Sequence, residues 1–253
     1  GPRRPTGPSQ PPAPRPVPMP RAAEAACARA AAALSVAQRP LAVIGSQALV
    51  CASEVESVAR AVTRLGIPVY LSGMARGLLG REHPLQMRHA RRGALRESDC
   101  VLLAGVPCDF RLDYGRHVRR AATLIAANRS GKDARLNRRP TIAAIGDAGA
   151  TLQALAQRIP DGVARPGWVG QLRARDAARE VEIDAQAQAA GEHVNPVAFF
   201  RMLEHAIGDD AVMVADGGDF VATASYILRP RSPLAWLDPG AFGTLGVGAG
   251  FAL

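Results

Sequence analysis

The sequence contains few of the residues from which disulfide-rich folds and metal centres are built. Its four cysteines never form a Cys-x-x-Cys pair, and its five histidines never recur at metal-ligand spacing. Aromatic residues make up only 4% of the chain, which together with abundant alanine and glycine favours helices packed closely on a sheet. A disulfide scaffold and a zinc site are therefore disfavoured, and a reducing environment is expected.

Long apolar stretches are also missing. No run of about 18 or more apolar residues occurs, and Gly1–Pro20 lacks the apolar stretch of a signal peptide. We therefore expect the chain as given to be soluble and to have no transmembrane segment. Because it begins with Gly1 rather than Met and ends at Gly250–Leu253 inside an apolar run, we also expect a fragment.

The chain carries an excess of positive charge, with 31 Lys and Arg against 22 Asp and Glu and a formal net charge of +9. Such an excess can indicate nucleic-acid binding. The arginines are scattered, however, with no aromatic residues interleaved among them and no zinc-finger spacing. We therefore expect a solvated basic surface, with attraction of an anionic cofactor as the alternative, and no nucleic-acid partner.

Short apolar runs alternate with helical patterns from Arg39 onward, which indicates β-α-β units. Fully apolar parallel strands are covered by helices on both faces, so the predicted fold class is α/β with a doubly wound parallel sheet. Strands are predicted at 41–44, 68–71, 100–104, 122–126 and 141–145. Helices are predicted at 22–37, 53–65 and 151–158, and one more is predicted to end at Glu97.

Composition divides the chain into four parts. Residues 1–38 are predicted to be a proline-rich linker and an alanine-rich helix, and residues 39–160 the doubly wound domain. A linker region follows at 161–194, with its charged helix at 171–190. Residues 195–253 are predicted to begin a second, incomplete α/β domain, with one helix and then a strand at 211–215.

Ligands of a parallel doubly wound sheet bind outside the carboxyl ends of its strands. Small residues there let a ligand approach the backbone, and helix N-termini supply amide donors for phosphate. A glycine can also merely make a turn, and an arginine can merely form a surface ion pair. The candidate nucleotide-binding residues at these strand ends are Gly45, Ser46, Gln47, Met74, Ala75, Arg76, Arg111, Asn128, Gly146 and Asp147.

Two glycine-containing segments of the second unit are candidates for a diphosphate site. The first follows a predicted strand and precedes a helical stretch, where a diphosphate could meet exposed amides. The second is a glycine-rich loop at 238–250 that runs into an apolar helix, and no strand is predicted to lead straight into it. A dinucleotide-binding fingerprint is therefore disfavoured. The candidate residues are Asp216, Gly217, Gly218, Asp219, Gly243, Thr244, Leu245 and Gly246.

The stretch 236–248, Trp-Leu-Asp-Pro-Gly-Ala-Phe-Gly-Thr-Leu-Gly-Val-Gly, resembles the beginning of the diphosphate-binding domain of thiamine-diphosphate-dependent enzymes. The resemblance is strongest to the acetolactate synthase-like and 2-hydroxyacyl-CoA lyase members of that family. Supporting stretches occur in the family's order at 43–49, 73–84, 108–112 and 216–220. Together they cover the chain from Arg39 to Leu253.

The resemblance implies a role for each part of the chain. Residues 39–160 are similar to the family's central domain, which holds FAD, ADP or CoA at the strand ends, with Asn128 where relatives usually carry Asp at the ribose. Residues 195–253 are similar to the start of the diphosphate-binding domain. There Asp216–Asp219 would line the diphosphate, Gly243–Gly246 would contact the aminopyrimidine, and Leu245 would support the bent thiamine diphosphate.

Two catalytic features of the family are expected to lie outside this sequence. The Glu that helps to generate the ylid belongs to a separate pyrimidine-binding domain. The Mg²⁺ ligands, a Gly-Asp-Gly motif and an Asn, would lie beyond Leu253. Without the metal the diphosphate charge is uncompensated, so we expect this chain alone to be inactive and assign it no catalytic and no metal-binding residue.

The implied reaction is cleavage of a 2-hydroxyacyl-CoA to formyl-CoA and a shortened aldehyde, with thiamine diphosphate as electron sink. One alternative is an acetolactate synthase that condenses 2-keto acids, and another is a non-catalytic module that binds ADP, CoA or FAD. The resemblance further implies a homodimer or homotetramer. It also implies that the full-length family member is anchored in the endoplasmic reticulum membrane by an N-terminal segment that this chain lacks.

Overall fold

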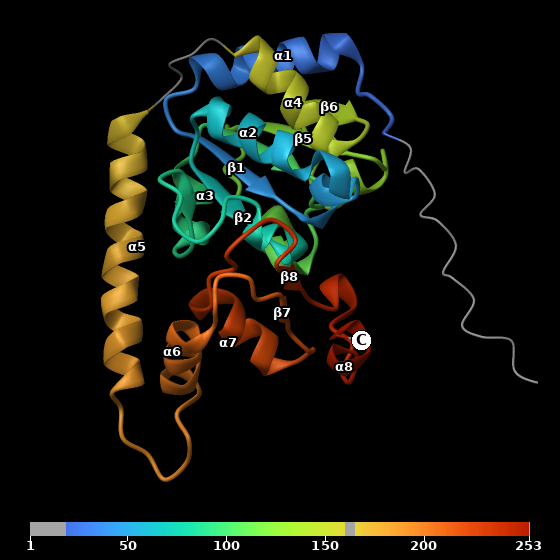
Figure 1. Cartoon of the computed structure of the whole chain (residues 1–253). Coiled ribbons are helices and arrows are strands. Elements are labelled where there is room, and N and C mark those ends of the chain that lie inside the picture. The colour runs from blue at the N-terminus through green and yellow to red at the C-terminus, as the bar shows by residue number, and fades with distance from the viewer. Residues whose placement is uncertain (1–18, 160–164, 253) are drawn as a thin grey trace, which may run out of the picture.

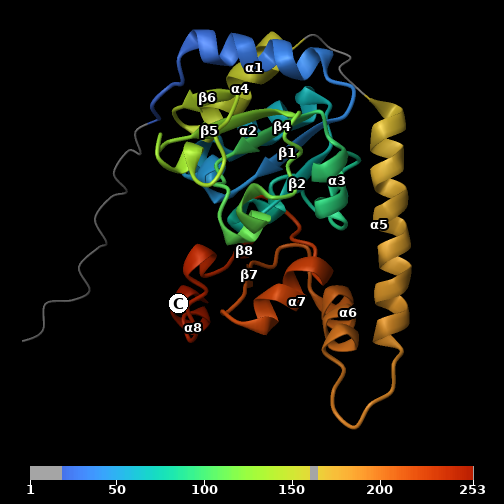
Figure 2. The same cartoon turned by 180° about the vertical axis from the view of Figure 1, so that it is seen from behind.

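The structure is a computed structural model that describes residues 19–159 and 165–252. The proline-rich part predicted at 1–20 lies outside these ranges, except for its last two residues. A parallel six-stranded sheet occupies the middle of the first module, residues 19–159 (Figures 1 and 2). Its strands are β1 (Pro40–Ile44), β2 (Val69–Leu71), β3 (Gln86–Met87), β4 (Cys100–Ala104), β5 (Thr123–Asn128) and β6 (Ile142–Ile145).

The strands lie side by side in the order β3-β2-β1-β4-β5-β6, so the predicted doubly wound parallel sheet is confirmed. The chain first builds the sheet outward from β1 to β3 and then returns to place β4 on the other side of β1. Ile44 is level with Leu71 of β2 and with Ala104 of β4. The carboxyl ends of the three central strands therefore meet at one edge, on both sides of the point where the strand order reverses.

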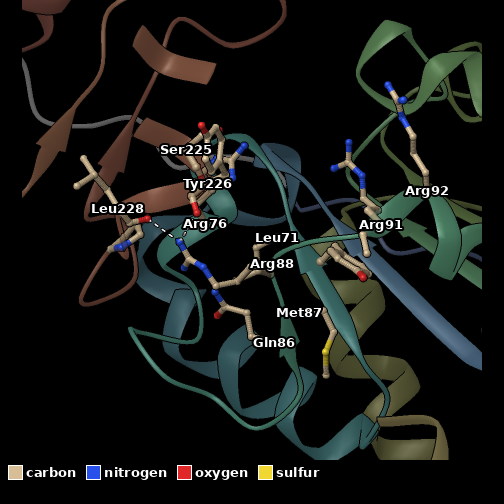
Figure 3. A pocket seen from close by; sticks show the side chains of 13 residues that line it. Leu71, Arg76, Gln86, Met87, Arg88, Arg91, Arg92, Ser225, Tyr226 and Leu228 are labelled. Atoms are coloured by element: carbon tan, nitrogen blue, oxygen red, sulfur yellow. Dashed lines mark hydrogen bonds between the residues drawn. The ribbon is translucent and has the colours of Figure 1, made fainter. Parts of the chain in front are cut away.

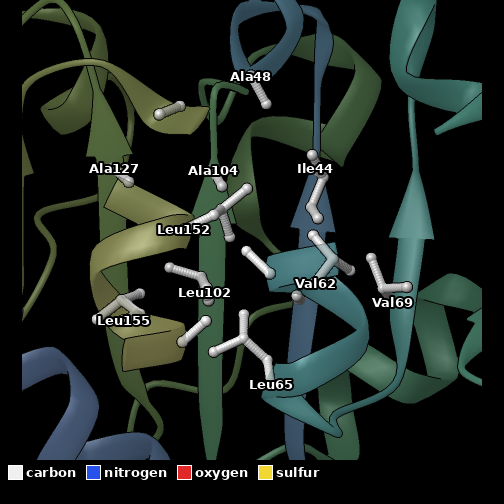
Figure 4. Packing of buried hydrophobic residues seen from close by; sticks show 14 of the residues in the cluster. Ile44, Ala48, Val62, Leu65, Val69, Leu102, Ala104, Ala127, Leu152 and Leu155 are labelled. Carbon is white, nitrogen blue, oxygen red and sulfur yellow. The ribbon is translucent and has the colours of Figure 1, made fainter. Parts of the chain in front are cut away.

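Side chains alternate along each strand between two cores, as the pleat of a sheet requires. Ala42 and Ile44 face one core, whereas Leu41 and Val43 face the other. Figure 4 shows the first core between the sheet and two of its helices. The first core is covered by α1 (Glu24–Val36), α2 (Val55–Leu65) and α4 (Ala148–Arg158), and the second by α3 (Arg91–Glu97) and the first turns of α5 (Pro166–Ala187).

Helix α2 illustrates how the local sequence sets these layers. Its buried residues Val55, Val58, Val62 and Leu65 recur every three or four positions and form one apolar face. Gly66 ends the helix in the left-handed conformation, with φ +67°. The chain can then turn directly into β2.

The second module, residues 196–252, is smaller. It consists of α6 (Pro196–Ala206), β7 (Met213–Val214), α7 (Asp219–Ile227), β8 (Trp236–Leu237) and α8 (Gly248–Ala252). Strands β7 and β8 pair in parallel, and the fully buried Trp236 lies in the module's core. Because β8 leads directly into the glycine-rich loop, the prediction that no strand precedes this loop was wrong.

Helix α5 extends along the side of both modules (Figures 1 and 2). It begins at Pro166, earlier than the charged helix predicted to start at Gln171, because proline fits the first turn of a helix. None of the described helices is both long and apolar enough to cross a lipid bilayer. Short 3₁₀ turns complete the fold: η1 (Ser46–Leu49), η2 (Ala52–Glu54), η3 (Gly73–Gly77), η4 (Phe110–Gly115), η5 (Asp133–Arg135) and η6 (Gly240–Phe242).

Candidate functional site

The carboxyl ends of β1 and β4 form the point where the strand order reverses, at which ligands of such sheets bind. Gly45 and Gly105 follow these two strands, and their backbones pack closely. A Cβ atom on Gly45 would lie 2.7 Å from the carbonyl oxygen of Gly105. Gly105 itself has φ +71°, a conformation that other residues rarely adopt. Both glycines are therefore needed for two backbone segments to pass each other at this point.

Residues predicted after β1 and β2 meet at this edge. The Ser46 hydroxyl oxygen accepts a hydrogen bond from the backbone N–H of Met74 at 3.1 Å. The Gln47 side chain accepts one from the backbone N–H of Arg129, beyond β5, at 3.4 Å. Ala75 is fully buried beneath them. Ser46, Gln47 and Met74 thus form a connected group, although Ala75 offers no surface to a ligand.

The ends of β5 and β6 are partly covered by the chain itself. Asn128 is only 1% exposed, and its side-chain oxygen accepts a bond from a backbone amide two residues further on. Asp147 caps α4 by accepting a bond from the backbone N–H of Ala150 at 2.9 Å. The segment Pro20–Ala22 lies against Gly146, and the Pro20 carbonyl accepts a bond from the N–H of Asp147 at 2.6 Å. These predicted residues therefore have local structural partners.

Two predicted arginines point to protein partners rather than to the strand ends. Arg76 donates a hydrogen bond to the carbonyl of Ser225 at 3.0 Å, and its guanidinium carbon lies 5.8 Å from the ring centroid of Trp236. It thereby joins the two modules. Arg111 forms an ion pair with Asp109 at 2.6 Å, which is the alternative to ligand binding that the sequence left open for it.

The two glycine-containing segments of the second module lie against each other. A Cβ atom on Gly217 would lie 2.5 Å from the carbonyl oxygen of Thr244 and 2.6 Å from that of Gly243. Gly218 has φ +85°, and a Cβ atom there would lie 3.2 Å from a methyl group of Leu245. Gly217 and Gly218 of the first segment therefore lie against Gly243, Thr244 and Leu245 of the second.

Asp216 fixes the second of these segments. Its Oδ1 atom accepts hydrogen bonds from the backbone N–H groups of Gly217 at 2.7 Å and Val247 at 3.3 Å. Bonds from the amides of Gly217 and of residues 246–248 hold the pKa of Asp216 below its ordinary value. The carboxylate is therefore ionised and orients the loop that ends in Gly246.

The start of α7 can accept an anion. Gly218 is its N-cap residue and provides no side-chain cap. The first amides of the helix therefore have no side-chain cap, and a negatively charged group would reach them beside the carboxylate of Asp219 in the first turn.

The surroundings of this site suit an organic cofactor with a diphosphate. Leu245 is 71% exposed beside Gly218. A mostly apolar cavity of about 320 Å³ adjoins Asp216 and is lined in part by Phe200, Phe220 and Trp236. Free amides for the diphosphate and apolar side chains for the rings therefore occur together. Among the residues with described positions, no three acidic, His or Cys side chains gather to hold a metal ion.

A second cavity, of about 390 Å³, lies between the modules (Figure 3). One side is formed by β2, β3 and the start of α3, and the other by the end of α7 and the residues after it. Arg88 points toward α7, and its Nη2 atom donates to the carbonyl of Leu228 at 2.9 Å. The arginines at this cavity are Arg76, Arg88, Arg91 and Arg92.

Of these four arginines, only Arg76 was predicted from the sequence to bind a ligand. Arg88, Arg91 and Arg92 were interpreted as part of a scattered, solvated surface. The signal that could have grouped them is their spacing within five residues of one loop and helix start, directly after β3. Because β3 is only two residues long, its end was not recognised as a strand end.

Comparison with known proteins agrees with this geometry. The profile of the family described as "Thiamine pyrophosphate enzyme, central domain" matches residues 27–155, about half of the chain. The match covers most of α1, the helix before the sheet, and all six of its strands.

Similar proteins include two named 2-hydroxyacyl-CoA lyase 2. The one from Homo sapiens is 45% identical over 225 residues, and the one from Xenopus laevis is 49% identical over 234 residues. Each alignment covers 87% of this chain but 36% of the relative, so the chain spans about a third of the length of these curated relatives. An acetolactate synthase large subunit from Mycobacterium tuberculosis is 38% identical over 229 residues, covering 89% of this chain and 41% of that protein.

Proposed function

Because the chain belongs to the thiamine pyrophosphate enzyme family, we propose that it is part of a lyase that cleaves a 2-hydroxyacyl-CoA to formyl-CoA and a shortened aldehyde. The observation that carries the proposal is the packing of Gly217 against the carbonyls of Gly243 and Thr244, which gives two separate segments one common surface. The names of the human and Xenopus relatives support the substrate class. Since the chain spans about a third of these relatives, the activity is assigned to the whole protein.

Thiamine diphosphate would supply the electron sink that cleavage of a carbon–carbon bond needs. The first amides of α7 would hold its diphosphate, and Leu245 would support its rings. Asp216 would keep the glycine-rich loop in position through the amides that it binds. Mg²⁺ would neutralise the diphosphate, but no ligand is assigned to it within the described ranges.

Three further properties of the whole protein are proposed from the family resemblance alone. ADP, CoA or FAD would bind at the strand ends of the first module, beside Ser46, Gln47 and Met74. The whole protein would be a homodimer or homotetramer. It would be located at the endoplasmic reticulum membrane.

Condensation of 2-keto acids is the second candidate function, and the similarity to an acetolactate synthase large subunit favours it. The two candidates use the same cofactor but different substrates, a 2-hydroxyacyl-CoA for the lyase and 2-keto acids for the synthase. A direct assay on both substrates therefore separates them.

A chimeric enzyme tests the proposal. The matched segment of the human 2-hydroxyacyl-CoA lyase 2 is replaced by the corresponding segment of this chain, and cleavage is followed by chromatography of formyl-CoA and the aldehyde. We expect cleavage by the chimera and at least a tenfold lower kcat in its Leu245→Ala variant, since an apolar support beneath the cofactor is lost. Gly170→Ala, at a position on α5 with no atom nearby to obstruct a side chain, is the matched control and should leave the activity unchanged.

The outcomes separate the candidates. Conversion of pyruvate to acetolactate without cleavage of the acyl-CoA would refute the lyase function and support the synthase function. A folded chimera that binds thiamine diphosphate and converts neither substrate would refute both.

A further inference from the structure

The cavity between the modules is lined by positively charged side chains. Four arginines occur among the described residues that line it, and none of those residues is acidic. Burial lowers the pKa of Arg76 to about 10 and, aided by the nearby Arg229, that of Arg88 to about 10. Burial also lowers the pKa of Arg91. Positive charge is thus concentrated in a largely desolvated place where an anion would be attracted strongly.

The protein partners of these arginines are mainly carbonyl oxygens. Arg76 donates to Ser225, Arg88 to the end of α7, and Arg91 to the carbonyl of Arg111 at 2.6 Å. Carbonyls satisfy donors but carry no full negative charge. The charge of the guanidinium groups is offset in part by the carboxylates of Asp238, Glu180 and Glu204, which lie outside the cavity lining.

Buried polar atoms without a hydrogen-bond partner also indicate a ligand in this cavity. The Nε atoms of Arg76 and Arg88 are buried and have no hydrogen-bond partner in the described part of the chain. The side-chain oxygen of Gln86, which also lines the cavity, is buried and unpartnered too. Buried polar groups are normally bonded, so a group that offers several acceptor oxygens and a hydroxyl would complete this site.

We infer that this cavity binds a phosphate group, with the exposed Arg92 and the partly buried Arg91 as its ligands and Arg76 and Arg88 as the buried charges beside them. Arginine presents its N–H groups as a fork that matches phosphate geometry. The site is separate from the amides of α7 at Gly218 and from the point where the strand order reverses, because it lies at β2, β3 and the far end of α7.

Two sources can supply such a group: the phosphates of a CoA thioester, or those of another phosphate ester such as a nucleoside diphosphate. Assignment to CoA rests on the proposed function, whereas the phosphate site itself does not. Inorganic pyrophosphate, which has no organic part, therefore tests the site independently of the lyase activity.

The experiment measures the Kd of pyrophosphate for the 253-residue chain by isothermal titration calorimetry at constant ionic strength. We expect saturable binding that Arg92→Ala weakens about tenfold, the effect of losing one charge-assisted contact. Arg92 is exposed, so its removal should not disturb folding. Arg91→Lys keeps the charge but removes the paired N–H groups of the guanidinium, and it should weaken pyrophosphate binding less than Arg92→Ala does. Arg29→Ala is the matched control, since it removes an equal charge from an exposed residue of α1 outside this cavity and should leave the Kd unchanged.

Absence of saturable pyrophosphate binding would overturn the inference, as would equal weakening by Arg92→Ala and Arg29→Ala. Competition between CoA and pyrophosphate, together with no competition by phosphate-free pantetheine, would support CoA as the source. Competition by ADP but not by CoA would keep the phosphate site and overturn its assignment to CoA. A chimera inactive on acyl-CoA would reject the proposed function without affecting the pyrophosphate result.

Discussion

Replacement of Gly217 by alanine should destabilise the second module and leave the first unchanged. The added methyl group would lie 2.5 Å from one carbonyl oxygen and 2.6 Å from another, on Thr244 and Gly243. Close C···O contacts in proteins are about 3.3–3.6 Å, so the glycine-rich loop must move by about 0.9 Å. Overpacking of this kind costs about 1–3 kcal/mol of unfolding free energy. The displaced part is backbone rather than a flexible side chain, which favours the upper half of that range.

Tryptophan fluorescence can follow the two modules separately during urea denaturation. Trp236 is buried in the core of the second module, and Trp168 is buried in a core of the first. In a Trp168→Phe background the remaining signal reports on the second module alone. Gly170→Ala, a substitution inside α5 with free space around it, is the control and should stabilise the chain by about 0.5–1 kcal/mol. Equal midpoints for the wild type and Gly217→Ala would refute the close approach of the two segments.

Two more predictions concern buried charge. The side chains of Arg231 and Glu204 are only 3% and 6% exposed and form an ion pair at 2.8 Å. Arg231→Met should lower the free energy of unfolding, measured by urea denaturation, by about 3–5 kcal/mol, because a buried carboxylate loses this partner. The double variant with Glu204→Leu should recover part of the loss, and strict additivity would contradict the pairing. Burial opposes ionisation of Glu180, but bonds from His89 and Arg201 outweigh it and lower its pKa from 4.5. The contribution of the ionised Glu180 to the free energy of unfolding should therefore be complete above about pH 4.5 and be lost progressively as the pH falls below that value. The difference in unfolding free energy between the wild type and Glu180→Gln should accordingly shrink in acid. A constant difference from pH 7 to pH 3 would refute this role.

The strands that the sequence predicts well are those whose burial is continuous. All residues of β1 and β4 are buried, and such strands appear in the sequence as apolar runs between turn residues. Strands β3 and β8 have two residues each and leave no periodic signal. Their positions depend on parallel pairing with β2 and β7, which is a tertiary property.

The site shows the same difference between what local sequence patterns predict and what depends on tertiary contacts. The strand-end residues Ser46, Gln47 and Met74 were predicted as a group because parallel strands bring their carboxyl ends to one edge. The partner of Arg76 could not be predicted in that way. Its guanidinium reaches the carbonyl of Ser225, which is 149 positions away in the sequence and belongs to the other module. A long side chain at a strand end can thus leave the edge that its backbone helps to form.

Helix α7 relates the proposed phosphate site to the proposed diphosphate site. Its N-terminus at Asp219 carries the positive end of the helix dipole and lies beside Gly218, whereas its C-terminal carbonyls carry the negative end. Those carbonyls would repel a phosphate group in the cavity between the modules. Arg88 lies between them, because it donates to the carbonyl of Leu228 and also lines the cavity. The guanidinium therefore neutralises the end of the helix and provides positive charge for the ligand, so that a single helix can have an anion near each of its ends.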